Sequence, residues 1–142
     1  MSKENSLERF VDAQAGTYQD ALTEIKNGRK QSHWMWYIFP QVQGLGFSST
    51  SKYYAIKDMD EAREFLKHPV LGSRLIEISN VLLQLPTNNP NKVFGSPDDL
   101  KLKSSMTLFA ALNENPVFEA VLQKYFNGVK DDKTLQIIKV TK

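Results

Sequence analysis

The fold is decided by the stretch GRKQSHWMWYIFPQ, residues 28–41, which is followed two residues later by Gly44-Leu45-Gly46. Both tryptophans of the chain lie in this stretch, beside one of its two histidines. From Trp34 to Phe39 every side chain is apolar or aromatic, so the segment belongs inside, but its periodicity fits a buried strand and a short helix equally. We call residues 28–41 the aromatic stretch and expect the rest of the chain to pack around it.

The composition is that of one folded domain with a core. The chain has 142 residues, of which 41% are hydrophobic and 24% are charged, and a domain of about this size buries roughly 68–70% of the surface of its unfolded chain. The net charge is +2, from 18 basic and 16 acidic residues that are mixed along the chain. No basic block is present of the kind that binds nucleic-acid phosphates, so we expect no DNA binding.

The sequence has no cysteine and no apolar segment typical of a signal peptide or a membrane span, and both facts restrict the class of protein. Cysteine does not occur, which excludes a disulfide, a thiolate nucleophile and a thiolate metal site. The first residues do not lead into an apolar signal core, and no apolar run approaches the roughly 18 residues of a membrane span. We therefore expect a cytoplasmic protein that does not bind a membrane; the sequence carries no signal for its oligomeric state.

Apolar spacing predicts helices on both sides of the aromatic stretch. Before it, Ser6 is the expected N-cap of a helix through Gln14, and Thr17 is the expected N-cap of a second helix that ends at Gly28. After it, the sequence predicts a helix over residues 60–67, a long amphipathic helix from Pro69 to Leu85, a surface loop over residues 86–95, helices that begin at Ser96 and at Asn115, and a tail over residues 131–142 that is a helix or a strand. The prediction is one compact, mainly α-helical domain, residues 1–142, with residues 1–5 flexible.

Several segments together carry a resemblance to a known family. They are Ala13-Gln14, residues 33–41 with Gly44-Leu45-Gly46, then Tyr54-Ala55-Ile56, residues 68–75 (HPVLGSRL), residues 94–102 (FGSPDDLKL) and residues 104–109 (SSMTLF). In these motifs and their order, nearly the whole chain resembles the domain-of-unknown-function family 1810.

That resemblance implies an all-α fold, and we expect a single compact domain of about six to eight helices. It also implies a small cytoplasmic protein without an established activity. Some members carry a calpain-inhibitor-like label, but such inhibitors are disordered chains with short repeated motifs. Because this chain is compact and unrepeated, we do not expect that role.

The aromatic stretch supplies the first candidate site residues. His33, beside Lys30 and two indoles, can act as a general acid or base or as a ligand contact, or it can simply be satisfied within an aromatic core. Trp34 and Trp36 offer flat surfaces for stacking on a base, a nicotinamide or a sugar, although at least one is expected to be core. They share a face only in an extended chain. Gln41 is a suitable amide for reading a polar ligand.

The helix after Ser96 supplies the second group, Lys101, Ser104, Ser105 and Thr107. Serine and threonine are mediocre helix formers, so their clustering needs a reason. One interpretation is a catalytic Ser–Lys dyad of Lys101 and Ser104, in which burial lowers the lysine pKa. The other is close helix packing through small residues, together with a surface ion pair of Asp98 with Lys101.

These candidates lead to two hypotheses of function. In the first, a polar, aromatic-lined pocket between the aromatic stretch and the helix over residues 98–107 binds a small anionic or nucleotide-like ligand, with hydrolysis as a candidate reaction. A short similarity of residues 115–118 and Gly128 to the tail of the NADAR group of ADP-ribose-processing N-glycosidases supports it. In the second, the protein is a non-catalytic interaction module.

The hypotheses differ in geometry. A pocket requires Lys30, His33, Gln41 and Ser104 to converge on one concavity, whereas a module leaves them dispersed, with both indoles packed. We expect no cofactor and no metal, because two histidines without cysteine leave no metal-ligand spacing in the sequence.

Overall fold

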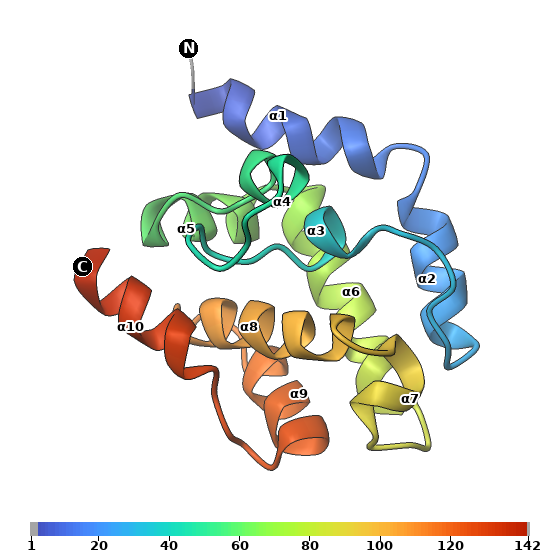
Figure 1. Cartoon of the computed structure of the whole chain (residues 1–142). Helices are drawn as coiled ribbons and strands as arrows, with labels where there is room; N and C mark the ends of the chain where they lie inside the picture. The colour runs from blue at the N-terminus through green and yellow to red at the C-terminus, as the bar shows by residue number, and fades with distance from the viewer. Residues whose placement is uncertain (1–2, 142) are drawn as a thin grey trace.

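The computed structural model describes the backbone of residues 3–141 and the side chains of residues 7–139. This part of the chain contains ten helices and no strand. In chain order the helices are α1 (Lys3–Gln14), α2 (Tyr18–Lys26), α3 (Met35–Ile38), α4 (Ser49–Tyr53), α5 (Met59–Lys67), α6 (Leu71–Gln84), α7 (Pro90–Phe94), α8 (Asp98–Ala110), α9 (Val117–Phe126) and α10 (Asp132–Thr141). They form one domain, which confirms the predicted all-α fold (Figure 1).

Helix α8 is at the centre of that domain. It packs against α5, α7, α9 and α10, and Figure 1 shows it crossing the middle of the molecule. Every side chain from Ser104 to Phe109 is buried. A helix that is buried on all sides needs small residues where its neighbours approach, so the small polar side chains of this segment are part of the core.

The aromatic stretch forms a short helix, α3, rather than a strand. Trp34 precedes this helix and Trp36 lies within it, so the two indoles point to different faces. Trp34 is 0% exposed and packs near Phe39 and Phe94, with ring centroids 6.2 and 6.5 Å away. Trp36 is only partly buried. One indole therefore belongs to the core and the other to the surface of a cavity described below.

Several predicted helix boundaries are wrong by a few residues. Helix α1 begins at Lys3, so Ser6 lies inside it and is not its N-cap. Thr17 is the N-cap residue of α2, but its side chain makes no capping hydrogen bond. Helix α8 begins after Pro97 rather than with Ser96 as its cap. Of the first five residues, expected to be flexible, residues 3–5 form the start of α1, and residues 1 and 2 lie outside the described part of the chain.

The predicted loop over residues 86–95 contains a short helix, α7. The Asn89 side chain accepts hydrogen bonds from the amides of Asn91 and Lys92, which starts this helix. Val93 and Phe94 are buried, as the sequence predicts. The tail, which was open between helix and strand, is the helix α10.

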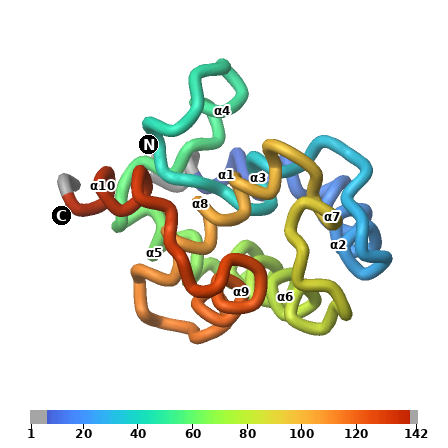
Figure 2. Tube along the Cα trace, turned by 60° about the horizontal axis from the view of Figure 1, so that its bottom comes forward, coloured from blue at the N-terminus to red at the C-terminus, as the bar shows by residue number. Residues whose placement is uncertain are grey.

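Residues 41–56 form an arm that carries α4, and we call this segment the α4 arm. Figure 2 shows α4 projecting from the rest of the chain. Both ends of the arm meet in a parallel bridge, in which Ile56 N donates to Gln41 O and Gln43 N donates to Ile56 O, both at 2.8 Å. Arg9 holds the returning segment of the arm, because its guanidinium donates to Tyr53 O at 2.6 Å and to Ala55 O at 2.7 Å.

None of the helices within residues 3–141 has the length and apolar character that a bilayer span requires.

Candidate functional site

A cavity of about 650 Å³ lies between Trp36 and the α4 arm, and we call it the Trp36 cavity. Its volume is in the range of roughly 300–1,000 Å³ that small-molecule sites occupy. None of the described residues that line it is acidic, and apolar surface dominates its wall. The lining residues are Trp36, the chain from Gln41 to Phe47, Ser51, Lys52, Tyr54, Ala55 and, from α10, Ile137.

Gln41 places a hydrogen-bonding group in this apolar wall. The residue is 6% exposed, and its Nε2 atom is buried without a hydrogen-bond partner among the described residues. Leaving a buried polar group unpaired costs about 1–3 kcal/mol. Gln41 is among the residues that line the Trp36 cavity, and its role in reading a polar ligand stays a prediction.

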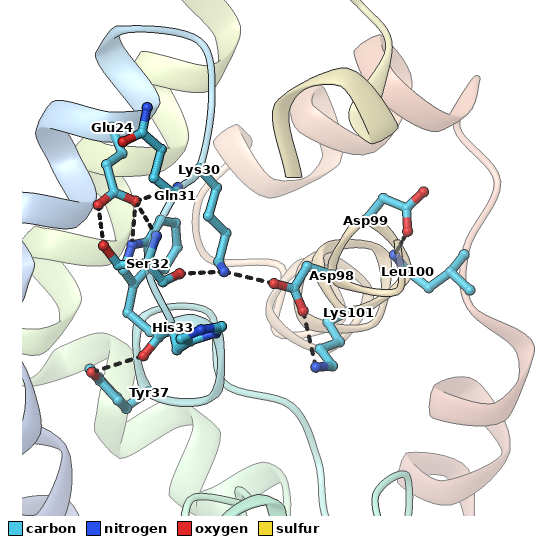
Figure 3. Close-up of polar contacts among 11 residues, drawn as sticks. Glu24, Lys30, Gln31, Ser32, His33, Tyr37, Asp98, Asp99, Leu100 and Lys101 are labelled. Atoms are coloured by element: carbon cyan, nitrogen blue, oxygen red, sulfur yellow. Dashed lines mark hydrogen bonds and ion pairs between the residues drawn. The ribbon is translucent and has the colours of Figure 1, made fainter. Parts of the chain in front are cut away.

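Trp36 is held in place by a charged cluster at the start of α8. The Lys101 ammonium lies 4.3 Å from the centroid of the Trp36 ring and pairs with Asp98 Oδ1 at 3.0 Å. The second oxygen of Asp98 pairs with Lys30 at 2.7 Å, and Lys30 in turn lies 5.0 Å from the centroid of the Trp34 ring. Figure 3 shows Asp98 between the two ammonium groups. One carboxylate thus links two lysines, each above a tryptophan.

The two lysines also keep Asp98 ionised. Burial alone would raise the pKa of this carboxyl group, but the hydrogen bonds and charges of Lys30 and Lys101 outweigh burial and lower the pKa. The predicted ion pair of Asp98 with Lys101 is therefore present, with Lys30 as a second partner.

The structure does not form the Ser–Lys dyad. The Ser104 hydroxyl donates to the backbone oxygen of Leu100 at 3.2 Å, and among the described residues no hydrogen bond joins it to Lys101. The Thr107 hydroxyl donates to Lys103 O at 2.8 Å and accepts from the backbone amide of Asp131 at 2.9 Å. These contacts fit the packing interpretation of the small residues in α8. Ser105 is fully buried as well, and its hydroxyl has no partner in the described part of the chain.

The other predicted site residues do not converge on one concavity. His33 is exposed and does not line the Trp36 cavity. Lys30 lies in the wall of a different hollow, together with Arg29 and Lys92. Of the predicted residues, Trp36 and Gln41 line the cavity, and Lys101 borders it through the Trp36 ring. Within the described chain, no group of three or more metal-ligating side chains is close enough to hold a metal ion.

The cavity also lies elsewhere than the sequence predicts. The expected position was between the aromatic stretch and the helix over residues 98–107, but no described residue of α8 lines the cavity. The physical reason is that Lys101 covers a face of the Trp36 ring next to α8. The α4 arm approaches the indole instead, since a Cβ atom on Gly46 would lie 3.2 Å from Trp36 Cη2 and 2.6 Å from Ser51.

Most residues of the cavity wall were missed, among them Phe47, Lys52, Tyr54 and Ile137. Phe47 is 85% exposed, and a large aromatic residue in a polar loop beside two glycines is a signal that could have been weighed. Ile137 gives no such signal, because its place in the wall depends on how α10 docks.

Glu24, which the sequence analysis also missed, fixes the path of the aromatic stretch. Its carboxylate accepts hydrogen bonds from the Gln31 amide at 2.7 Å, from the Ser32 amide at 3.0 Å and from the Ser32 hydroxyl at 2.6 Å. It also accepts from the Trp34 indole N–H at 2.9 Å (Figure 3 shows the contacts with Gln31 and Ser32). Partial burial would raise the pKa of Glu24, but these hydrogen bonds outweigh it and lower the pKa from 4.5 to about 2.

We expect Glu24 to make the fold less stable in acid. Its pKa is lower in the folded chain than in the unfolded chain, so its contribution to stability is present above about pH 4.5 and is lost as the pH falls toward 2. Urea denaturation of the parent and of Glu24→Gln across this range should show a shallower pH dependence in the variant. If the free energy of unfolding varies with pH equally steeply in the parent and in Glu24→Gln, ionisation of Glu24 does not contribute to stability. The matched control is Glu8→Gln, which removes an exposed carboxyl group on α1.

Comparison with known proteins gives one family and one solved structure. The model of the family described as protein of unknown function, DUF1810, matches residues 4–138. The crystal structure of the conserved hypothetical protein Rv1873 from Mycobacterium tuberculosis is similar with a TM-score of 0.92 and 44% sequence identity. The similarity covers 94% of this chain and 96% of that chain. None of the curated proteins compared with the sequence matches it.

Proposed function

Because the chain belongs to the DUF1810 family, whose description names no activity, we propose a function from the site itself: binding of a small anionic or nucleotide-like ligand in the Trp36 cavity. The observation that carries this proposal is the buried and unpartnered amide of Gln41 in the wall of an apolar cavity. A satisfied protein core rarely leaves such a donor unpaired.

The cavity suits a flat ring with a polar edge. Trp36 and Tyr54 contribute aromatic surface, which gives a large contact area at little cost in side-chain entropy. Gln41 can then pair with an acceptor on the edge of the ring. Hydrolysis receives no support from this geometry, because His33 and Ser104 do not line the cavity. The proposal is therefore limited to binding.

One observation favours the interaction module as a second candidate. Phe47 and Tyr53 are 85% and 60% exposed, and both lie on the α4 arm. Exposed aromatic side chains of this size are enriched where proteins bind one another. This candidate would gain weight if no small molecule bound and Phe47→Ser weakened association with a partner protein.

The Gln41→Met variant tests the proposed function. We expect ribonucleosides or their 5′-monophosphates to raise the melting temperature of the parent, since a ligand at a hundred times its dissociation constant stabilises a fold by about 2.7 kcal/mol. The variant keeps the side-chain volume but removes the amide, so it should bind about tenfold or more weakly. Its unfolding free energy should be unchanged or higher, because an unpaired buried group has been removed.

The two readouts separate a binding role from a structural one. If Gln41 stabilises the fold, Gln41→Met will be clearly less stable than the parent, which contradicts the proposal. Failure of every nucleoside and nucleotide to bind would contradict it too. Gln84→Met, an exposed position at the end of α6, is the matched control and should change neither readout.

A further inference from the structure

The loop between Gln43 and α4 presents backbone amides that the protein itself does not use. Gln43 N is paired with Ile56 O, and the Ser48 side chain accepts from the Ser51 amide at the start of α4. Between these points, the amides of Gly44, Gly46 and Phe47 make no hydrogen bond to the described part of the chain. All three residues line the Trp36 cavity, and an amide without a partner in the protein needs water or a ligand as its acceptor.

Two glycines, Gly44 and Gly46, leave the backbone of this loop without side chains at their positions. Gly44 has a φ of +102°, which L side chains rarely adopt. A Cβ atom on Gly46 would lie 2.6 Å from the Ser51 side chain, so a larger residue would force the arm apart. As a result, neither glycine places a side chain beside its own amide. Consecutive loop amides of this kind form concave sites that bind anions.

Among the described residues that line the cavity, the only charged side chain is the positive one of Lys52. Lys52 lies in the cavity wall, and its ammonium has no partner among the described residues. None of the described residues of the wall is acidic, and Lys101, 4.3 Å from the centroid of the Trp36 ring, is paired with Asp98. An anion at the loop would therefore meet an unpaired cation and no repelling carboxylate within the wall.

We propose that the loop of residues 44–47, with Lys52 as counter-ion, binds the phosphate of a phosphate monoester whose ring lies against Trp36. This inference rests on the proposed function and adds to it the class of ligand and its orientation. A phosphate monoester carries three terminal oxygens and close to two negative charges at neutral pH, so it can accept from several amides and an ammonium group at once. The Gln41 amide is left to pair with the ring.

Paired titration calorimetry tests this orientation. Each of the common ribonucleosides is titrated beside its own 5′-monophosphate into the parent, Lys52→Gln, Lys52→Arg and Lys67→Gln. Lys67 is exposed at the end of α5 and provides the same change in net charge away from the cavity. In the parent we expect one monophosphate to bind about tenfold or more tightly than its nucleoside, and added salt to weaken only the monophosphate.

The variants decide whether the contact is at the loop. Lys52→Gln should bring the monophosphate close to the affinity of the nucleoside, whereas Lys52→Arg and Lys67→Gln should keep the difference. Equal binding of nucleoside and monophosphate to the parent would overturn the phosphate site and leave the proposed function intact. A monophosphate preference that survives in Lys52→Gln would overturn the role of Lys52. Absence of binding in every pair would overturn the proposed function, and this inference with it.

Discussion

Replacement of Trp34 by alanine is expected to lower the free energy of unfolding by about 3–5 kcal/mol. The indole is 0% exposed, and its removal would leave a cavity between Phe39 and Phe94. The variant would also lose the hydrogen bond from the indole N–H to Glu24 and the cation–π contact of Lys30 with the indole ring. Urea denaturation followed by far-ultraviolet circular dichroism measures the loss.

Trp36→Ala is the matched control, because it removes the same side chain two residues away. Trp36 is only partly buried and lines the cavity, so less contact is lost and the stability should fall by less than half as much. Its larger effect should be on ligand binding. Equal losses of stability in the two variants would contradict the assignment of Trp34 to the core and Trp36 to the cavity wall.

The second large effect is expected for Arg9→Met. Arg9 pairs with Glu61 at 3.4 Å, and the two side chains are 11% and 5% exposed. Removing one partner of a buried ion pair typically costs about 3–5 kcal/mol, because the other charge stays buried. Glu61 would keep the hydrogen bond from the Lys57 amide at 2.7 Å but lose its cationic partner. The variant also leaves the backbone oxygens of Tyr53 and Ala55 without their donor, so it should loosen the α4 arm. Thermal and urea denaturation report the loss of stability.

Two further variants make this result specific. Arg63→Met removes the solvent-accessible ion pairs of Arg63 with Asp60 and Glu114, for each of which about 0–1 kcal/mol is expected. Adding Glu61→Gln to Arg9→Met should recover part of the stability, because the stranded charge is then gone. The assignment fails if Arg9→Met costs no more than Arg63→Met.

The long helices could be predicted from the sequence because their apolar residues repeat over several turns. Helices α3, α4 and α7 could not, since each is only four or five residues long and about one turn shows no period. The tail was open because Thr134, Ile137 and Ile138 are β-branched. Its helical form is favoured by Asp131, whose side chain accepts from the Thr134 amide at 2.9 Å and from the Thr134 hydroxyl.

Residues of the candidate site could be predicted only where aromatic and polar side chains cluster in one segment of the sequence. Trp36 and Gln41 lie in the aromatic stretch and could be chosen from residue type and spacing. Lys52 and Ile137 come from segments without a chemical pattern, and the contacts of Arg9 with the α4 arm, which help to place Lys52, join residues more than forty positions apart. The hydroxyl groups of α8 suggested a catalytic Ser–Lys dyad, but in the structure they are buried in the core. Sequence spacing alone does not show that neighbouring helices pack against this helix on all sides.

Because Ile137 lies in the cavity wall, the cavity is complete only after α10 has folded and docked. The other lining residues lie between positions 36 and 55, whereas Ile137 belongs to α10, which docks on α8. Until α10 has docked, the wall of the cavity lacks the Ile137 side chain. Under the proposed function, ligand binding would therefore stabilise molecules in which α10 has docked over those in which it has not.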